Sequence, residues 1–277
     1  MENSMTTSTP PKEYKPQGLW RYAQHYDDYA LVQNWAGEKL MGFCEAKHAC
    51  RILDIGCGTG SFTVRLKERY PSAPLTALDI SAQVLALARK KLMNYSDVDY
   101  SLEDIEQTSF SHSFDLMASN VSLQWVKDFD ALIRRLKRAL ASSGEVVFST
   151  FGPGTFLELQ RALEDVFGRE SLISAARFLS EEALRGTLQK HFTRVFIKRH
   201  WVSQEYANLT ELLRSIKYTG AQGSPRGVPL FWTPETLGAI ENVYRKNIAQ
   251  NPAIHNKAGS FYATYEVLLC RVKGPRG

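Results

Sequence analysis

The stretch RILDIGCGTGSF, residues 51–62, places three glycines at alternate positions directly after an apolar run. An apolar run, a cluster of glycines and an amphipathic segment are typical of a buried strand, a tight turn and a helix. Glycine has no Cβ, so such a turn lets a ligand approach the backbone closely. Residues 51–62 therefore predict a ligand-binding strand–turn–helix unit.

Strands and helices alternate after this unit, which predicts an α/β fold with a doubly wound, mostly parallel sheet. The sequence predicts seven strands, with the last one antiparallel, at residues 51–56, 75–80, 99–105, 114–120, 144–151, 193–202 and 260–273. It predicts helices at residues 61–70, 81–92 with Ser81 as cap, 128–140, 154–167 and 180–192. Ligands of such sheets bind beyond the carboxyl ends of the strands.

The chain outside the alternating core divides into three further segments. Residues 1–18 are expected to be a disordered tail and residues 19–48 a set of N-terminal cap helices, around a core of residues 49–202 and 260–273. Residues 203–259 are too many for a plain connection between strands, so we expect an inserted helical lid. Asn208 with Glu211, and Thr233 before Pro234, mark the starts of its two helices.

Composition excludes several classes of protein. The chain has 277 residues, 44% hydrophobic content and a net charge of +5, without the dense basic stripes of nucleic-acid binders. Its four scattered cysteines predict neither a disulfide framework nor a zinc site, and no apolar run is long enough to span a membrane. We expect a cytoplasmic monomer that binds neither metal, nucleic acid nor membrane.

The glycine turn itself favours a nucleoside ligand. Its GxGxG spacing differs from the dinucleotide-binding pattern GxGxxG. Asp79 lies 19 residues after Gly60, at the end of a predicted strand, where its carboxylate can bind both hydroxyls of a ribose. Asp104 and the amide of Ile105 can address an adenine ring. These features fit a nucleoside without a pyrophosphate. A nicotinamide-binding domain, or a turn that serves only packing, is the alternative.

The segments LDIGCGTG, ALDIS, LEDIE and SNVSLQWV, in this order and spacing, resemble the motifs of class I S-adenosylmethionine-dependent methyltransferases. The resemblance implies that Asp54 faces the methionine amino group and that the glycine loop cradles the cofactor. It implies a cofactor site made of Asp54, Gly56, Cys57, Gly58, Gly60, Asp79, Ile80, Asp104, Ile105 and Asn120.

The N-terminal segment carries a possible cover for that site. Tyr22, Tyr26, Tyr29 and Gln33 recur at helical spacing, so one aromatic and polar helix face can close over the cofactor. The alternative is a helix whose tyrosines only pack against the edge of the domain.

Three segments, AQHYDDYALVQ, SNVSLQWVKDFDALIRRLKRAL and LLRSIKYTGAQG, resemble the malonyl-[acyl-carrier-protein] O-methyltransferases of biotin synthesis, over about residues 20–273. This resemblance implies methylation of the free carboxylate of malonyl-acyl carrier protein or malonyl-CoA, giving S-adenosylhomocysteine and the methyl ester that primes pimeloyl assembly. The alternatives are another carboxyl or small-molecule methyltransferase, acting on trans-aconitate or a quinone precursor, and a non-catalytic S-adenosylmethionine-binding protein.

The implied reaction needs few catalytic groups, because a carboxylate is already ionised and nucleophilic at neutral pH. Arg214, Lys217 and Tyr218 share one helix face and are candidates to hold the acceptor carboxylate, although a solvated charged face explains them equally well. Asn120, Gln124 and Trp125 are expected to face the methyl group, with Trp125 as an alternative core residue.

Two basic surfaces could dock an acidic carrier protein. One is the helix face with Arg134, Arg135, Lys137 and Arg138, and the other is the strand pair Lys198 and Arg199. The alternative for each surface is that its basic side chains contact only solvent and dock no partner.

Overall fold

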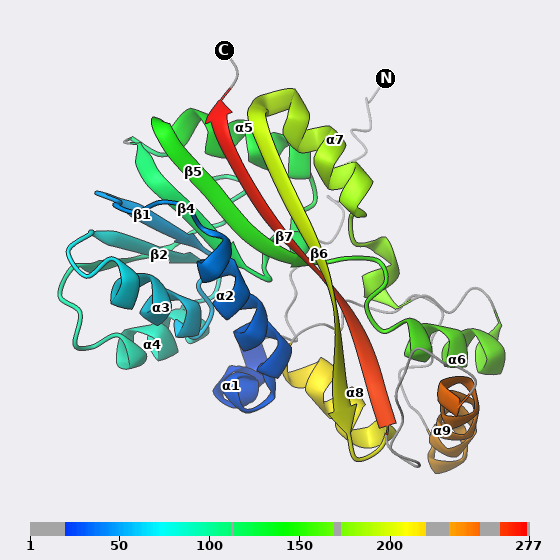
Figure 1. Cartoon of the computed structure of the whole chain (residues 1–277). Helices are drawn as coiled ribbons and strands as arrows, with labels where there is room; N and C mark the ends of the chain where they lie inside the picture. The colour runs from blue at the N-terminus through cyan, green and yellow to red at the C-terminus, as the bar shows by residue number, and fades with distance from the viewer. Residues whose placement is uncertain (1–19, 112, 169–172, 220–232, 250–260, 276–277) are drawn as a thin grey trace, which may run out of the picture.

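The computed structural model describes residues 20–111, 113–168, 173–219, 233–249 and 261–275. They form one seven-stranded sheet in the order β3-β2-β1-β4-β5-β7-β6 (Figure 1). The strands are β1 (Ile52–Ile55), β2 (Leu75–Asp79), β3 (Val98–Leu102), β4 (Phe114–Asn120), β5 (Leu140–Phe151), β6 (Phe192–Tyr206) and β7 (Phe261–Pro275). β1 to β5 pair in parallel, and β7 is antiparallel to both β5 and β6, so the predicted fold class is confirmed.

Helices cover both faces of the sheet (Figure 1). The helices are η1 (Trp20–His25), α1 (Tyr26–Tyr29), α2 (Leu31–Phe43), α3 (Ser61–Arg69), α4 (Ala82–Lys91), η2 (Leu123–Trp125), α5 (Phe129–Ala139), α6 (Leu157–Phe167), η3 (Ser174–Arg177), α7 (Glu181–His191), α8 (Leu209–Tyr218) and α9 (Pro234–Ala249). One apolar cluster joins α2, α3 and α4 to one face, and a second joins α5 and α7 to the other.

Helix α5 shows how the sequence pattern becomes packing. Its buried residues, Phe129, Leu132, Ile133 and Leu136, recur at helical spacing and form one apolar stripe. Each such side chain stabilises the fold by about 1.5–3 kcal/mol relative to exposure. The Asp128 carboxylate caps the helix by accepting a hydrogen bond of 2.8 Å from the amide of Ala131.

The four basic residues on α5 differ in their exposure. Arg134 and Arg138 are exposed, whereas Arg135 and Lys137 are only partly exposed. Arg135 donates to the carbonyl of Thr108. Long cationic side chains can cover apolar surface with their stems while the charged end reaches a polar partner.

The N-terminal segment is not the continuous helix that its tyrosine spacing predicts. It consists of η1, the single turn α1 and the longer α2, with a break at Ala30. Tyr26 and Tyr29 therefore lie on α1 and Gln33 on α2, not on one helix face. Ala30 has φ −81° and ψ 36°, so the chain leaves the helical conformation at this residue.

Strands β6 and β7 are longer than the predicted strands. They stay paired out to Tyr206 and Phe261, so residues 203–206 belong to the sheet and not to the predicted lid. Asn208 and Thr233 cap α8 and α9 as predicted, whereas Ser81 precedes α4 without accepting a capping hydrogen bond. The predicted tail of residues 1–18, and residues 220–232 and 250–259 of the predicted lid, lie outside the described residues.

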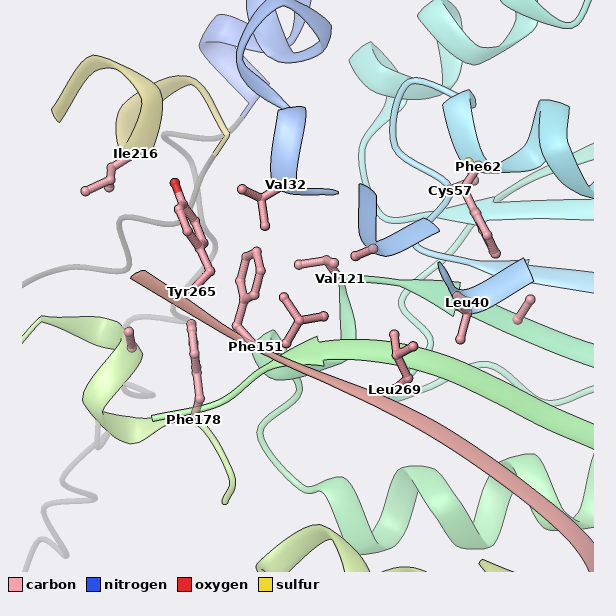
Figure 2. Close-up of a cluster of buried hydrophobic side chains, with 14 of the residues drawn as sticks. Val32, Leu40, Cys57, Phe62, Val121, Phe151, Phe178, Ile216, Tyr265 and Leu269 are labelled. Carbon is pink, nitrogen blue, oxygen red and sulfur yellow. The ribbon is translucent and has the colours of Figure 1, made fainter. Parts of the chain in front are cut away.

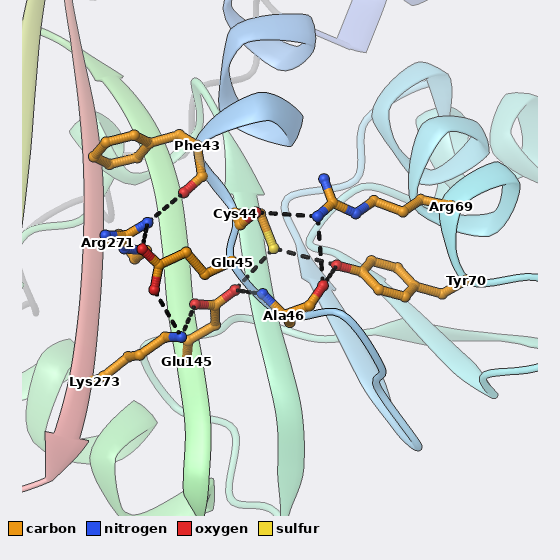
Figure 3. A network of polar contacts seen from close by, with 9 residues as sticks. All are labelled: Phe43, Cys44, Glu45, Ala46, Arg69, Tyr70, Glu145, Arg271 and Lys273. Atoms are coloured by element: carbon orange, nitrogen blue, oxygen red, sulfur yellow. Dashed lines mark hydrogen bonds and ion pairs between the residues drawn. The ribbon is translucent and has the colours of Figure 1, made fainter.

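The chain between α2 and β1 is tied to the sheet by a polar network (Figure 3). Glu145 on β5 is 1% exposed and accepts hydrogen bonds from the Cys44 thiol and the amide of Ala46, and it forms an ion pair with Lys273 on β7. Glu45 pairs with Arg271 and Lys273. These contacts anchor the carboxyl end of α2, and its other end reaches the carboxyl edge of the parallel strands.

Candidate functional site

The glycine loop after β1 contains three glycines with positive φ, namely Gly56, Gly58 and Gly60. A Cβ on Gly56 would come within 2.1 Å of the Ser122 hydroxyl, and one on Gly60 within 3.2 Å of Ala88 on α4. Gly58 has φ +57° and no heavy atom within 4 Å of the Cβ position. Gly56 and Gly60 therefore allow close packing, whereas Gly58 faces the space that a ligand can use.

Asp54, at the end of β1, is a buried carboxylate with spare bonding capacity. It is fully buried, and its Oδ2 accepts a hydrogen bond of 2.6 Å from the Thr63 hydroxyl on α3. Its Oδ1 has no hydrogen-bond partner among the residues that the structure describes. Burial raises the pKa of Asp54 to about 7, partly offset by Thr63. A buried acceptor without a partner is costly, so Oδ1 suits a cationic or hydrogen-bonding ligand group.

Asp79, at the end of β2, holds the glycine loop in place. Its two carboxylate oxygens accept hydrogen bonds of 2.9 Å from the amides of Gly58 and Ser81. Burial raises the pKa of Asp79, and the two amides oppose that shift. Burial also raises the pKa of the Tyr26 phenol, with smaller effects from the charges of Asp27 and Asp79, so Tyr26 stays a neutral hydroxyl.

Apolar side chains follow the ends of β2 and β3. Ile80 is 47% exposed and Leu102 is 56% exposed, although both are large aliphatic residues. Asp104 accepts a hydrogen bond from the amide of Glu106 and so shapes the turn after β3, and Ile105 beside it is half-buried. Exposed aliphatic surface next to Asp79 and Asp104 suits a flat ring with polar edges.

The end of β4 connects to α2. Asn120 donates to the carbonyl of Gln33 at 2.9 Å and accepts from the Ser149 hydroxyl at 2.6 Å. The next residue, Val121, has φ +49°, which is a strained conformation for a β-branched residue. This turn sets the direction in which the chain leaves the sheet.

Gln124 and Trp125 follow that turn, and both have partners within the protein. The Gln124 amide donates to the carbonyl of Val121 and accepts from the Thr150 hydroxyl, and the Trp125 ring packs edge-on against Phe178 at 5.4 Å. Trp125 also packs against the main apolar core, as its alternative interpretation predicts.

A second carboxylate, Asp27 on α1, holds the N-terminal segment over the glycine loop. Its Oδ1 accepts hydrogen bonds from the hydroxyls of Thr59 (2.7 Å) and Ser61 (3.1 Å), and its Oδ2 pairs with Lys91 of α4 at 2.6 Å. Lys91 also donates to Ser61. These four residues, the Asp27 clamp, join α1, the glycine loop and α4.

The sequence interpretation missed the clamp and Thr63. Two hydroxyl residues inside the glycine turn, Thr59 and Ser61, were a signal for an acidic partner. The sequence did not say which acidic residue would reach them.

Helix α8 closes against the same segment. Its Tyr218 ring lies 4.8 Å from Tyr29 and 5.3 Å from His25 between ring centroids. Arg214 and Lys217 on α8 are exposed, and Lys217 lies 5.9 Å from the Tyr218 ring. Tyr22 lies in η1, and its side chain is outside the described part of the structure.

An apolar wall lies between these helices and the sheet. Figure 2 shows Val32 of α2, Ile216 of α8, Tyr265 of β7 and Phe151 of β5 gathered near Val121. The Tyr265 hydroxyl is 2.6 Å from that of Tyr206, so its polar end is satisfied. This wall presents apolar surface beside Val121, which follows the end of β4.

The described residues contain no cluster of His, Cys, Asp or Glu that could hold a metal ion. In the same part of the chain, no helix has both the length and the apolar character to cross a membrane. The arrangement instead offers one buried carboxylate with an open acceptor, a second at a strand end, a glycine loop and an apolar cover. These groups can bind a cationic nucleoside, and they shield it from water.

Comparison with known proteins identifies relatives over most of the chain. Residues 52–144 match a methyltransferase domain family. The chain is 30% identical over 233 residues to malonyl-[acyl-carrier protein] O-methyltransferase 2 of Ilyobacter polytropus. This alignment covers 84% of this chain and 89% of that protein. It is also 30% identical over 258 residues to the malonyl-[acyl-carrier protein] O-methyltransferase of Bacillus anthracis, covering 90% and 93% respectively.

Solved structures share the fold at lower identity. The YcgJ protein of Bacillus subtilis aligns with a TM-score of 0.59 and 14% identity, over 88% of this chain and 99% of that one. The N-methyltransferase NodS of Bradyrhizobium japonicum, in complex with S-adenosyl-L-homocysteine, aligns with a TM-score of 0.51 and 16% identity, over 94% and 98%.

Proposed function

This chain belongs to the malonyl-[acyl-carrier protein] O-methyltransferase family, and we propose that it transfers a methyl group from S-adenosylmethionine to the free carboxylate of malonyl-acyl carrier protein. The observation that carries this proposal is 30% identity to a family member over 84% of this chain and 89% of that protein. The resulting methyl ester would prime pimeloyl assembly in biotin synthesis, and malonyl-CoA is the other acceptor to test.

The residues at the strand ends fit S-adenosylmethionine. Asp54 Oδ1, buried and without a partner, suits the methionine amino group, and the space beside Gly58 suits the cofactor backbone. Asp79 suits the ribose hydroxyls, with Ile80, Asp104 and Ile105 around the adenine. We also propose Gly56, Cys57, Gly60, Gln33 and Asn120 as contributors to this site. When bound, the cofactor supplies an electrophilic methyl group on a positively charged sulfur.

The chain's own task is then to position the acceptor and exclude water. A malonyl carboxylate is ionised at neutral pH and needs no general base. Removing water strengthens the attraction between this carboxylate and a cationic methyl donor, and fixed positioning supplies much of the remaining acceleration. The apolar wall and the contact between α1 and α8 fit that task.

The acceptor side of the site includes helix α8. We propose that Arg214 or Lys217, with Tyr218, holds the acceptor carboxylate, because they share the helix whose Tyr218 touches Tyr29. Tyr22, Tyr26, Gln124 and Trp125 are proposed to surround the transferred methyl group. Tyr26 can serve only as a neutral hydroxyl, because its pKa is raised.

Complementation tests substrate and reaction together. A bacterial strain that lacks its own biotin-pathway methyltransferase should grow without biotin when it expresses this chain, and an Asp79→Ala, Asp54→Asn double variant should not support growth. Growth only with added biotin, despite soluble wild-type protein, would contradict the proposed substrate. The double variant controls for growth that does not depend on the site.

A further inference from the structure

A groove lies between helix α2 and the outer strand β6, beside the site. It has a volume of about 330 Å³ and is lined by Glu38, Lys39 and Phe43 of α2, Lys198 and His200 of β6, and Leu269 of β7. We call it the α2–β6 groove. Neither the cofactor residues nor the proposed acceptor residues line it, so its side chains have no role in the site described above.

The groove is lined by two lysines, Lys39 and Lys198, and by one acidic residue, Glu38, so its net charge is positive. Lys198 forms no ion pair with any described residue. The Lys39 ammonium lies 3.6 Å from the carboxylate of its neighbour Glu38, and both side chains of this pair are exposed. His200 has a pKa lowered first by burial and then by the charges of Lys198 and Lys39. Of the other acids on this face, Glu45 and Glu145 already pair with Arg271 and Lys273.

The same face also presents aromatic surface. Successive residues of a strand point to opposite sides, so Phe196, Lys198 and His200 share one face. The Arg271 guanidinium stacks between the rings of Phe43 and Phe196, at 5.0 and 4.4 Å from their centroids, and Phe196 is 43% exposed. A surface with lysines beside aromatic side chains fits an amphipathic, acidic protein helix.

Several cations of the alternative basic surfaces already have partners within the protein. Arg199, next to Lys198 in sequence, forms ion pairs with Glu181, Glu182 and Glu266, so it does not join the groove's cations. On α5, across the sheet, Arg134 pairs with Asp130 and Arg135 donates to Thr108. Cations that are already paired gain less from a docking partner.

The groove is close enough to the site for a flexible arm to connect them. Strand register aligns Lys198 with Leu269, Leu269 with Ser149, and Ser149 with Asn120. Three strand spacings separate Lys198 from Asn120, which is roughly 14 Å. Helix α2 links the two regions as well, because its Gln33 contacts Asn120 and its Lys39 lines the groove.

We propose that the α2–β6 groove is the docking surface for the acidic carrier protein, which presents its malonyl thioester to the site from there. This inference rests on the proposed function. It adds the surface that selects a carrier-bound acceptor over a small one.

Charge reversal tests the docking surface. Lys198→Glu should raise both the Kd and the KM for malonyl-acyl carrier protein about tenfold, since like charges across an interface oppose association. The kcat at saturating carrier and the affinity for S-adenosylmethionine should stay at wild-type values. Arg138→Glu on α5 is the matched control, because it makes the same charge change on the opposite face, and it should leave the Kd unchanged.

Calorimetric binding of malonyl-acyl carrier protein, measured in the presence of S-adenosylhomocysteine, gives the Kd without turnover. The inference is overturned if Lys198→Glu binds the carrier as the wild type does, or if Arg138→Glu weakens binding instead. An equal loss of malonyl-CoA turnover in Lys198→Glu would also overturn it, because the effect would then lie in the site. The proposed function fails separately, if the wild-type protein methylates neither malonyl acceptor.

Discussion

At the scale of single residues, Asp54 is held in an environment that suits it only when a ligand is bound. It is fully buried, Thr63 satisfies one of its oxygens, and the other has no partner. Its pKa of about 7 means that folding favours the neutral acid in the free protein. This contribution to stability is largest below about pH 4 and is lost as the pH rises through about 7. A cationic ligand group reverses that preference.

Cofactor affinity should therefore depend on pH through Asp54. A bound ammonium group favours the carboxylate, so binding lowers the Asp54 pKa and releases a proton near pH 6.5. Affinity for S-adenosylmethionine should rise between pH 5.5 and 7.5, as measured by calorimetry in buffers of different ionisation enthalpy. Asp54→Asn should bind more weakly and lose most of the proton release. Equal proton release by the variant and the wild type would assign the titration to another group.

Asp79→Ala should weaken cofactor binding without unfolding the protein. Hydrogen bonds to a charged group contribute about 1.5–3 kcal/mol, which corresponds to a Kd increase of roughly 10- to 150-fold. Part of this loss would come from the glycine loop, since Asp79 holds the amides of Gly58 and Ser81. Calorimetry gives the affinity, and thermal unfolding without ligand gives the control. An unchanged affinity would remove Asp79 from the site.

Residues with a strong local pattern were predictable from the sequence, and those whose partners are distant were not. The glycine turn, Asp54 and Asp79 follow from residues adjacent to strand ends. Asp27 did not, because its partners Thr59 and Lys91 lie 32 and 64 residues away in sequence. The spacing of Tyr22, Tyr26, Tyr29 and Gln33 predicted one helix face, but the backbone of Ala30 is not helical and divides the segment into α1 and α2.

At the scale of elements, the Asp27 clamp places the short α1 over the glycine loop. A helix of four residues is not stable by itself, so its position depends on these side-chain contacts. The clamp brings Tyr26 toward Asp79 and Tyr29 toward α8. Its partners, Thr59, Ser61 and Lys91, come from the two elements that frame the cofactor side of the site.

Asp27→Ala should loosen this cover and raise the KM for S-adenosylmethionine about fivefold. The clamp is partly exposed, so we assign it only about 1 kcal/mol. The melting temperature should change little, because α1 contributes no buried residues of its own to the core. Asp28→Ala is the matched control on the same helix, since Asp28 is exposed and its carboxylate is 3.8 Å from the His25 ring. Equal kinetics for the two variants would show that the clamp does not position the cover.

Ligands should also slow hydrogen exchange in the elements that cover the site. Bound S-adenosylhomocysteine and malonyl-acyl carrier protein should protect α1, the first turn of α2 and α8, because ordering suppresses local opening. The strands β5 and β7 should serve as a reference with unchanged exchange. Mass spectrometry of peptides from residues 26–35 and 209–218 measures the effect. Identical exchange with and without ligands would contradict a closing cover.

The alternation of strands and helices was predictable because each element has its own spacing of apolar residues and is bounded by capping or turn residues. The ends of β6 and β7 were not predictable, since the sequence around 203–206 is polar and resembles a loop. In the structure these residues pair with 261–264 of β7, and Tyr206 and Phe261 at the end of this ladder belong to the main apolar cluster. Polar edge-strand residues of this kind depend on a partner strand, which local sequence does not reveal.

At the scale of the whole molecule, the sheet separates three tasks. Its carboxyl edge carries Asp54, Asp79 and Asn120, the helices α1 and α8 meet over that edge, and the α2–β6 groove lies three strands away from Asn120. Helix α2 runs from the site to the groove and is anchored at its far end by the network around Glu145 (Figure 3). The architecture therefore fits an enzyme that receives its acceptor on a carrier.

The most direct test of the central claim is the mass of the acceptor after reaction. Purified protein should be incubated with S-adenosylmethionine labelled in its methyl group and, separately, with malonyl-acyl carrier protein, malonyl-CoA, free malonate and trans-aconitate. Intact-mass and fragment analysis should place one labelled methyl group on the malonyl carboxylate, with an equal amount of S-adenosylhomocysteine. Labelled methyl transfer to trans-aconitate or another free acid, and none to either malonyl thioester, would contradict the account.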